Sequence, residues 1–321
     1  MRKYRKLLIS ALLLVAVAAA GAFLLRRVTR PPEAARLLPE GDLLIYANFR
    51  PAHLFEAGRP SQLEEHYKDF IQQTGIEFER DLEEVAISRQ DTPDGRDVES
   101  SEVFIAHFDS GRVNDYFQKT AAAKEQYLGQ TIFLFPHEGH TVRVSVLRGG
   151  TIAVTNMDSA SPMHRIIDRL DSSGAPSLLE SYYHQVPAGS VAWMICRIPA
   201  KGNGLQLPGG MNFSFHQDAV AVASLRYAGA LLFRADFHTQ SDADARELAD
   251  SINAFVALSR TIGRSAGPKQ ADPDMKTAFD SVQAQQNGNT TVVTAQVPAN
   301  LLRKVVSEVQ IEGEAPATGK H

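Results

Sequence analysis

The chain has 321 residues, of which 44% are hydrophobic, and a formal net charge of −4. This length predicts one large domain or two ordinary domains with real hydrophobic cores. A single cysteine, Cys196, excludes an intramolecular disulfide and a zinc site built on clustered cysteines. Seven of the 33 basic residues lie within residues 1–30, which leaves 26 basic against 37 acidic residues and a net charge of −11. We therefore expect no nucleic-acid partner, because phosphate binding needs a basic surface.

Residues 7–25 form an uninterrupted apolar run without charge. In a helix this run is about 28 Å long, close to the thickness of the hydrocarbon core of a bilayer. It predicts a transmembrane anchor, with the lipid bilayer as the partner of residues 7–25. The alternative is a cleaved secretory signal, with residues 1–6 as its basic start and the small residues 18–22 as its cleavage region. We favour the anchor, because the apolar run continues to Leu25 and ends only at Arg26.

Four basic residues precede the apolar run and three follow it. This bias places the N-terminus in the cytoplasm and residues 31–321 in the periplasm. A cytoplasmic domain tethered by its N-terminus is the alternative orientation. Residues 1–30 are thus the basic start and the anchor, and the prolines of residues 30–33 make a short, stiff linker.

The first half of the folded part, residues 31–172, begins with a turn at residues 37–42. The pattern then predicts three helices in this half, with strands between them. The expected strands are 43–49, 85–88, 103–108, 131–135, 141–147 and 151–155, and the expected helices are 60–75, 109–123 and 158–170. Residues 90–101 are polar and predict a loop, and residues 172–176 predict the boundary between the halves.

The second half, residues 173–310, repeats this order. A Pro-x-Gly turn precedes the strand at 191–198, as a similar turn precedes the strand at 43–49. Two further pairs follow in the same order: residues 104–108 with 233–237, and 151–155 with 290–294. Apolar positions after the last pair also match, Met163, Ile166, Ile167 and Leu170 with Leu302, Val305, Val306 and Val309. We interpret the halves as diverged copies.

Other elements of the second half are read from their spacing. We expect a helix at 177–184, a loop at 201–210, strands at 213–215, 219–225 and 230–237, helices at 242–262 and 274–285, a linker at 264–273 and a disordered tail at 311–321. Adjacent strands separated by hairpin turns, with helices between them, indicate an α+β fold. The fold class is therefore an N-terminal transmembrane helix followed by two similar lobes with mostly antiparallel sheets and packed helices.

With a Leu-Pro-x-Gly type turn opening each lobe, the chain resembles bacterial exported or membrane-tethered proteins of unknown function with a duplicated α+β lobe. The resemblance covers the folded part and brings no catalytic residues.

Three features of the sequence are candidates for a chemical site. The sequence at 137–140, His-Glu-Gly-His, lacks the four-residue spacing of a helical zinc site and lies in a predicted turn. The carboxylates of Glu79, Asp81, Glu83 and Glu84 predict a solvated surface, with calcium binding as the lesser alternative. Cys196 lies among apolar residues and predicts a buried thiol. Nucleophile elbows, phosphate loops and dinucleotide motifs are absent from the sequence, so we predict no catalytic, cofactor-binding or metal-binding residue.

Two classes of function remain. The first is a non-catalytic binding or scaffolding domain, anchored in the membrane, that binds an envelope protein. The second is a lipid-like or small apolar ligand, or its hydrolysis, between the lobes, with Phe213, Phe215, Tyr227 and Phe233 as candidate lining residues. A weaker third possibility is assembly through the small residues 18–22 of the span.

Overall fold

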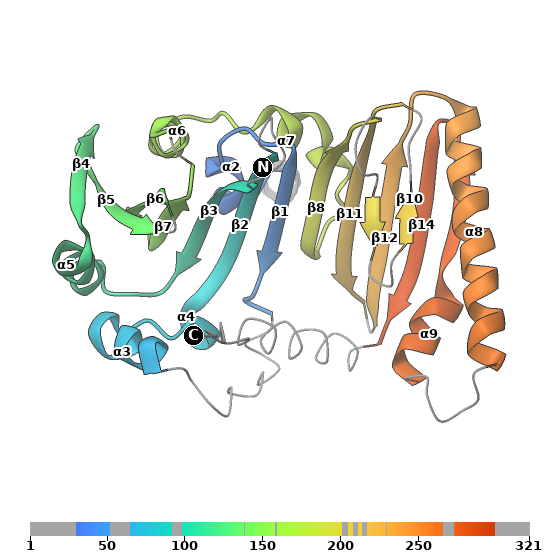
Figure 1. Cartoon of the computed structure of the whole chain (residues 1–321), viewed down its shortest axis with the longest axis horizontal. Helices are drawn as coiled ribbons and strands as arrows, with labels where there is room; N and C mark the ends of the chain where they lie inside the picture. The colour runs from blue at the N-terminus through green and yellow to red at the C-terminus, as the bar shows by residue number, and fades with distance from the viewer. Residues whose placement is uncertain are drawn as a thin grey trace, which may run out of the picture.

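The computed structural model describes residues 30–51, 65–91, 98–137, 139–157, 159–200, 205–207, 211–213, 217–228, 230–265 and 273–298 (Figure 1). Within these residues the fold is α+β and is dominated by one large antiparallel sheet. The predicted span at residues 7–25 lies outside them. Among the described helices, none combines the length and the apolar character needed to cross a bilayer.

Twelve described strands form the large sheet, in the order β13-β14-β12-β11-β8-β1-β2-β3-β7-β6-β5-β4. The strands of the first half are β1 (Leu43–Asn48), β2 (Leu82–Asp91), β3 (Val98–Ala106), β4 (Ala123–Tyr127), β5 (Gln130–His137), β6 (His140–Leu147) and β7 (Thr151–Thr155). Those of the second half are β8 (Ser190–Ile198), β11 (Ala219–Tyr227), β12 (Leu231–His238), β13 (Gln283–Asn287) and β14 (Thr290–Val297). A separate hairpin pairs β9 (Leu205–Leu207) with β10 (Met211–Phe213).

The two halves meet at β1 and β8, which pair in the antiparallel sense with Ile45 opposite Met194. From this pair outward, both halves follow the same plan. In the first half β1 is followed across the sheet by β2, β3 and β7, and in the second half β8 is followed by β11, β12 and β14. This matching order is what the predicted internal repeat requires. The division of the chain at residue 172 remains a prediction.

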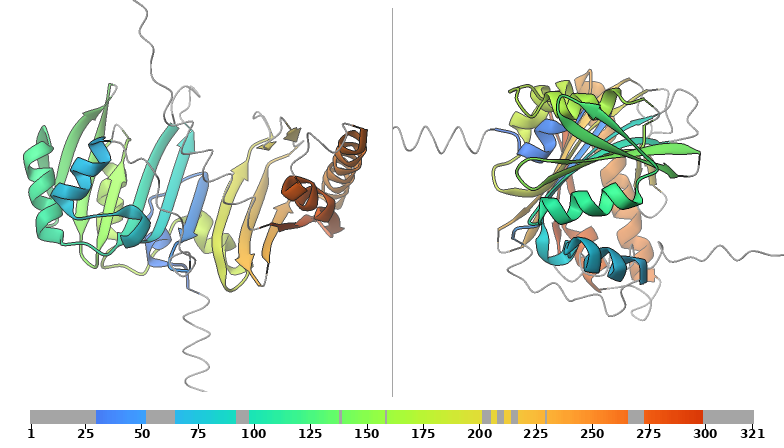
Figure 2. Two further views of the ribbon diagram at one scale, coloured as in Figure 1. Left: turned by 90° about the horizontal axis from the view of Figure 1, so that it is seen from below. Right: turned by 90° about the vertical axis from the view of Figure 1, so that its left-hand side faces the viewer.

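Helices lie on both faces of the sheet, as Figures 1 and 2 show. One face, which we call the back face, carries α2 (Glu33–Leu37), α6 (Ser161–Asp168) and α7 (Ser177–Tyr182), and α7 is followed by the short η2 (Tyr183–Gln185). We call the opposite face the front face. The front face carries α3 (Glu65–Thr74) and α5 (Ser110–Thr120) over the first half and α8 (Asp242–Ser265) over the second. Two further helices are α4 (Phe78–Asp81) and α9 (Pro273–Ser281).

The main core lies on the back face and includes residues of both halves. Leu44 of β1, Trp193 of β8 and Val222 of β11 pack in the same cluster as the buried side chains of α2, α6 and α7. Two smaller clusters lie on the front face. One is formed under α8, and the other under α3 and α5. The halves therefore share one hydrophobic core on the back face and have separate cores on the front face.

Local sequence explains where the two long front helices begin. Asp109 is the N-cap of α5, and its carboxylate accepts hydrogen bonds from the backbone N–H groups of Gly111 and Arg112. Before α8, the hydroxyl of Ser241 accepts a hydrogen bond from the N–H of Asp244 and donates one to the Asp244 carboxylate. Both contacts satisfy N–H groups that the first turn of a helix leaves without partners.

The outer edge of β13 is covered by a side chain of α8. The Asn253 amide donates to the carbonyl of Ala284 at 2.9 Å and accepts from the Ala284 N–H at 3.3 Å. These two bonds take the place of a neighbouring strand. An open depression of about 650 Å³ lies beside them, lined by Asn253, Arg260, Asp280 and residues 282–285.

The other outer strand, β4, carries Lys124 and Glu125, charges that discourage pairing with another sheet edge. Its hairpin with β5 turns through Leu128 and Gly129, both with positive φ, which fits the tight turns favoured between antiparallel strands.

Two predicted helices extend into residues that form strands, and the predicted loops at 90–101 and 201–210 contain strand residues of β2, β3 and β9. We expected the helix after Asp109 to continue to Ala123, but α5 ends at Thr120 and β4 begins at Ala123. We also expected a helix over 274–285, where α9 ends at Ser281 and β13 begins at Gln283. Both missed strands are the polar outermost strands of the sheet, and neither carries the apolar alternation that identifies a half-buried strand.

Candidate functional site

The middle of the front face carries apolar side chains that join none of the described core clusters. These are Ile45, Val85, Ile87 and Leu225, which we call the central strip, and all four are half-buried. Successive side chains of a strand point to opposite faces of the sheet. In β1 and β2 the adjacent side chains pack in the back-face core, and in β11 the side chains two positions away pack in the core under α8, so all four members of the strip point to the front. The strip lies between the α3–α5 core on one side and the α8 core on the other.

Strand register brings the strip together from distant parts of the chain. Ile45 is directly opposite Ile87 on one side and Met194 on the other. One row away, small residues separate the large ones. Ala47 lies opposite Val85 and Ala192, and Ala192 lies opposite Leu225. One row of the strip is therefore made of large apolar side chains. In the next row, the small side chains of Ala47 and Ala192 leave a shallow depression between Val85 and Leu225.

One carboxyl group borders the strip. Glu102 of β3 lies directly opposite Ile87 and, on its other side, opposite Val154. Burial raises the pKa of the Glu102 carboxyl, and the charge of Arg89 opposes this only in part. The strip therefore ends in a partly desolvated acidic group.

A polar cluster lies where β1 ends and β2 begins. The Arg50 guanidinium donates to Glu83 Oε2 at 3.0 Å from Nε and at 2.6 Å from Nη2, and it lies 3.4 Å from Glu84 Oε1. His107 Nε2 is 2.8 Å from Glu83 Oε1. Glu84 is only 7% exposed, and burial raises the pKa of its carboxyl although Arg50 opposes this. The phenol of Tyr46, also buried beside Glu84, has a raised pKa for the same reason.

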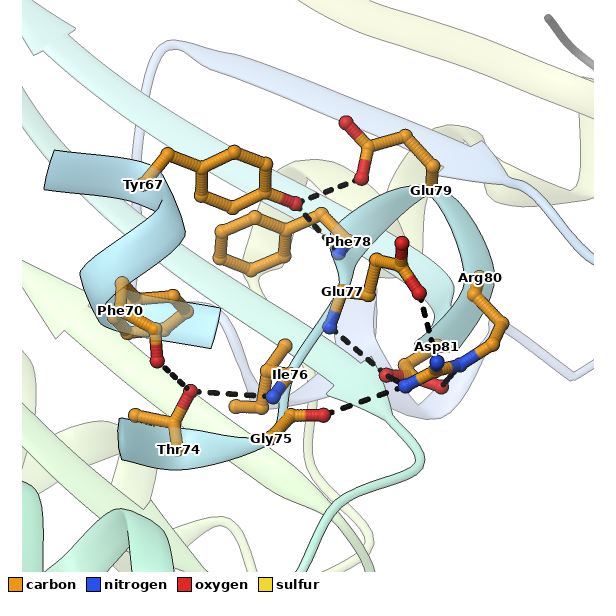
Figure 3. A network of polar contacts seen from close by, with 10 residues as sticks. All are labelled: Tyr67, Phe70, Thr74, Gly75, Ile76, Glu77, Phe78, Glu79, Arg80 and Asp81. Atoms are coloured by element: carbon orange, nitrogen blue, oxygen red, sulfur yellow. Dashed lines mark hydrogen bonds and ion pairs between the residues drawn. The ribbon is translucent and has the colours of Figure 1, made fainter. Parts of the chain in front are cut away.

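The acidic segment that precedes β2 is a self-contained network (Figure 3). Arg80 binds both oxygens of Asp81, at 2.7 Å each, and the carboxylate of Glu77. The Tyr67 hydroxyl donates to Glu79 at 2.7 Å and accepts from the Phe78 N–H. In Figure 3 the Glu79 and Asp81 carboxylates point to different partners.

The carboxylates of Glu79 and Asp81 thus have separate partners, whereas Glu83 and Glu84 share the Arg50 guanidinium. The four do not form one cluster of oxygen ligands. Nor does any other group of three or more His, Cys, Asp or Glu side chains in the described part of the chain have an arrangement that could hold a metal ion. The calcium alternative therefore gains no support from the geometry.

The histidine motif lies in a strand turn, as its proline and glycine predict. His137 ends β5, His140 begins β6, and the two are paired across the hairpin. Gly139 has φ +88°, which a glycine adopts without strain. Glu138 lies outside the described residues.

Cys196 is buried on the front face, and burial raises the pKa of its thiol to about 11. A thiol with this pKa stays protonated near neutral pH, so it is a poor nucleophile.

The aromatic residues proposed to line an interlobe cavity do not share one position. Phe233 is half-buried and packs against the front-face core under α8. Tyr227 is at the end of β11 with 53% of its surface exposed. Phe213 ends β10, and the placement of its side chain and of Phe215 lies outside the described structure.

Sequence reasoning missed a buried polar row on the back face. Arg143, Thr155, Ser101 and Ser88 lie on four adjacent strands and are directly opposite one another in turn. Each is buried and has a polar atom without a hydrogen-bond partner. The Arg143 Nη1 donates to the carbonyl of Met157, and the nearest carboxylate oxygen, of Glu125, is 4.0 Å from Nε. No sequence signal could have found this row, because it depends on strand register.

The fold and the surface features define an α+β protein built on a large antiparallel sheet. No protein-family model and no curated protein sequence matches the chain. Among solved structures it is similar to TP0453, a Treponema protein, in several crystal forms. For crystal form III the TM-score is 0.46 at 12% identity, covering 87% of this chain and 99% of TP0453. For crystal form IV the TM-score is again 0.46 at 12% identity, covering 85% and 96% of the two chains.

Proposed function

We propose that the protein is a non-catalytic binding module, anchored in the cytoplasmic membrane by residues 7–25, whose periplasmic part docks an envelope protein on the central strip. The observation that carries this proposal is the set of half-buried apolar side chains between the two front cores. Large apolar groups that join none of the described cores are the kind of surface that protein interaction sites use. The bordering Glu102 carboxyl and the net charge of −11 for residues 31–321 favour a partner segment that is apolar and carries a basic residue.

The alternative, a ligand held between the lobes, has less support. Strands β1 and β8 pair directly, and the back-face core includes side chains of both halves. An interlobe ligand site needs a gap at this junction, whereas the described residues fill it with hydrogen bonds and packed side chains. A solid junction is the arrangement expected of a platform that binds by its surface.

The test is crosslinking in intact cells of the tagged, full-length protein, followed by purification and mass spectrometry. The variant Ile87→Glu places a charge in the strip, and Leu258→Glu places the same charge on α8, where Leu258 is already 57% exposed. We expect one envelope protein to be recovered with the unmodified chain and with Leu258→Glu, and at least tenfold less with Ile87→Glu.

Fluorescence of Trp193, the only tryptophan, checks that each variant is folded. Recovery of no envelope protein above the untagged control would overturn the proposal. Equal recovery with a folded Ile87→Glu variant would overturn the assignment to the strip.

A further inference from the structure

The described part of the chain ends beside the central strip. Val297 is opposite Leu231, and two residues earlier Ala295 is opposite Phe233. Phe233 is in turn opposite Leu225, a member of the strip. The described chain ends at Pro298, directly after β14, which is two strands from β11 and the nearest member of the strip.

The residues that follow have the composition of a covering helix. Leu301, Leu302, Val305, Val306 and Val309 recur at helical spacing and form one apolar stripe. A helix over residues 301–311 is roughly 16 Å long. The strip runs from β11 across β8 and β1 to β2, three strand spacings or about 15 Å. The apolar stripe and the strip thus match in length, and residues 298–300 extend far enough, about 10 Å, to cross the two intervening strand spacings.

The side chains that each face of the sheet presents near Pro298 decide which face suits the apolar stripe. By the internal repeat, residues 302–309 correspond to α6, which packs on the back face. Near the exit point, however, the back face of β12 and β14 is mainly polar. It carries Arg234, Asp236, Thr294 and Gln296, and with them the apolar Leu232 and Val292, as their register and alternation show. The front face at the same place carries Leu225, Phe233 and Ala295. An apolar stripe therefore meets more apolar surface on the front than on the back, where charged and polar groups surround Leu232.

We propose that residues 301–311 dock on the central strip of the same molecule and cover it. The strip is then an intramolecular contact when no partner is bound, and an envelope protein must displace this segment to reach it. The intramolecular contact itself does not depend on the proposed partner.

Disulfide mapping in the full-length chain tests the contact. In a Cys196→Ser background, Leu302→Cys is combined with Leu225→Cys on the front face, and Val306→Cys is combined with Ile45→Cys. The matched control joins Leu302→Cys to Leu232→Cys, because Leu232 belongs to β12 and points to the back. Disulfides form only between cysteines whose Cα atoms approach to about 7 Å or less.

We expect at least one front pair to oxidise tenfold or more faster than the back pair. Faster oxidation of the back pair would overturn the proposal and place the segment where the repeat puts it. Oxidation of both front pairs no faster than that of Leu302→Cys with the remote Leu258→Cys would also overturn it. These oxidation rates do not depend on an envelope protein. A negative crosslinking result would therefore overturn the proposed function without overturning the intramolecular contact.

A second measurement uses no cysteine pair. Deletion of residues 299–321 should expose the strip and raise the fluorescence of a bound apolar dye several-fold, with Trp193 emission unchanged. Addition of Ile87→Glu to the deletion should remove the increase. Unchanged dye binding in the folded deletion variant would contradict covering of the strip.

Discussion

At the scale of single residues, burial determines the chemistry of the acidic groups. Glu102 lies between Ile87 and Val154 on the front face. Glu84 is buried next to Arg50 and Tyr46. Burial raises the pKa of both carboxyls, because removal from water penalises the charged form. Glu84 has an ion pair that offsets part of this penalty, whereas the charge near Glu102 is the exposed Arg89.

Glu102→Gln should therefore change how stability depends on pH. The folded-state pKa of Glu102 is above its ordinary value of 4.5, so the folded protein binds this proton more tightly than the unfolded chain does. The contribution of Glu102 to the free energy of unfolding is greatest below pH 4.5 and falls as pH rises through the folded-state pKa. Glu102→Gln abolishes that fall, so urea unfolding should show the variant gaining stability relative to the unmodified protein between pH 4.5 and pH 8.

The matched control is Asp115→Asn, which neutralises an exposed carboxylate on α5. It should follow the unmodified protein across the same range. A parallel pH dependence of Glu102→Gln and the unmodified protein would show that the carboxyl is as well solvated in the folded state as in the unfolded chain.

At the scale of elements, the sheet protects its two edges by different means. Along β13, Asn253 of α8 binds both backbone groups of Ala284. Along β4, charged side chains take that role. The amide of Asn253 is therefore a structural substitute for a strand, and its removal should have a larger effect than an ordinary substitution on a helix surface.

Asn253→Ala leaves the Ala284 N–H and carbonyl without these partners. We expect a loss of about 1 to 3 kcal/mol in the free energy of unfolding, as for other unsatisfied polar groups. We also expect faster aggregation by light scattering, since an open strand edge pairs with other chains. Asp250→Asn, an exposed change on the same helix, should alter neither measurement. A loss below about 0.5 kcal/mol would mean that water replaces the amide.

Elements with a local signature were predicted from the sequence. The capping residues Asp109 and Ser241 and the apolar spacing after them gave α5 and α8, and the apolar runs gave β1 and β8. The outer strands β4 and β13 were missed because most of their residues are polar and no apolar alternation marks them as strands. The central strip was missed for a related reason: both faces of β1 are apolar, so its sequence does not show which side chains a core covers.

At the scale of the whole molecule, the halves share one sheet and one back-face core. Trp193 stacks on Tyr46, with ring centroids 5.4 Å apart, so an aromatic pair crosses the junction. Fully buried side chains from both halves, Ile166 of α6 and Ile195 of β8, belong to the same cluster. Loss of either should therefore weaken the entire molecule and not one half.

We expect a single cooperative unfolding transition, with coincident curves from Trp193 fluorescence and from far-ultraviolet circular dichroism. Ile166→Ala and Ile195→Ala should each lower the free energy of unfolding by about 2 to 5 kcal/mol. Each should also shift both curves together. Two separated transitions, with Ile166→Ala moving only one of them, would show that the halves unfold independently.

The central position of β1 has a consequence for the order of events during synthesis. One edge of β1 pairs with β2, which follows it closely, but the other edge pairs with β8 and stays open until residues 190–198 have been made. The first half is therefore complete before the partner of this apolar strand edge exists. Aggregation through this open edge, more than the final stability, should then limit the yield of folded protein.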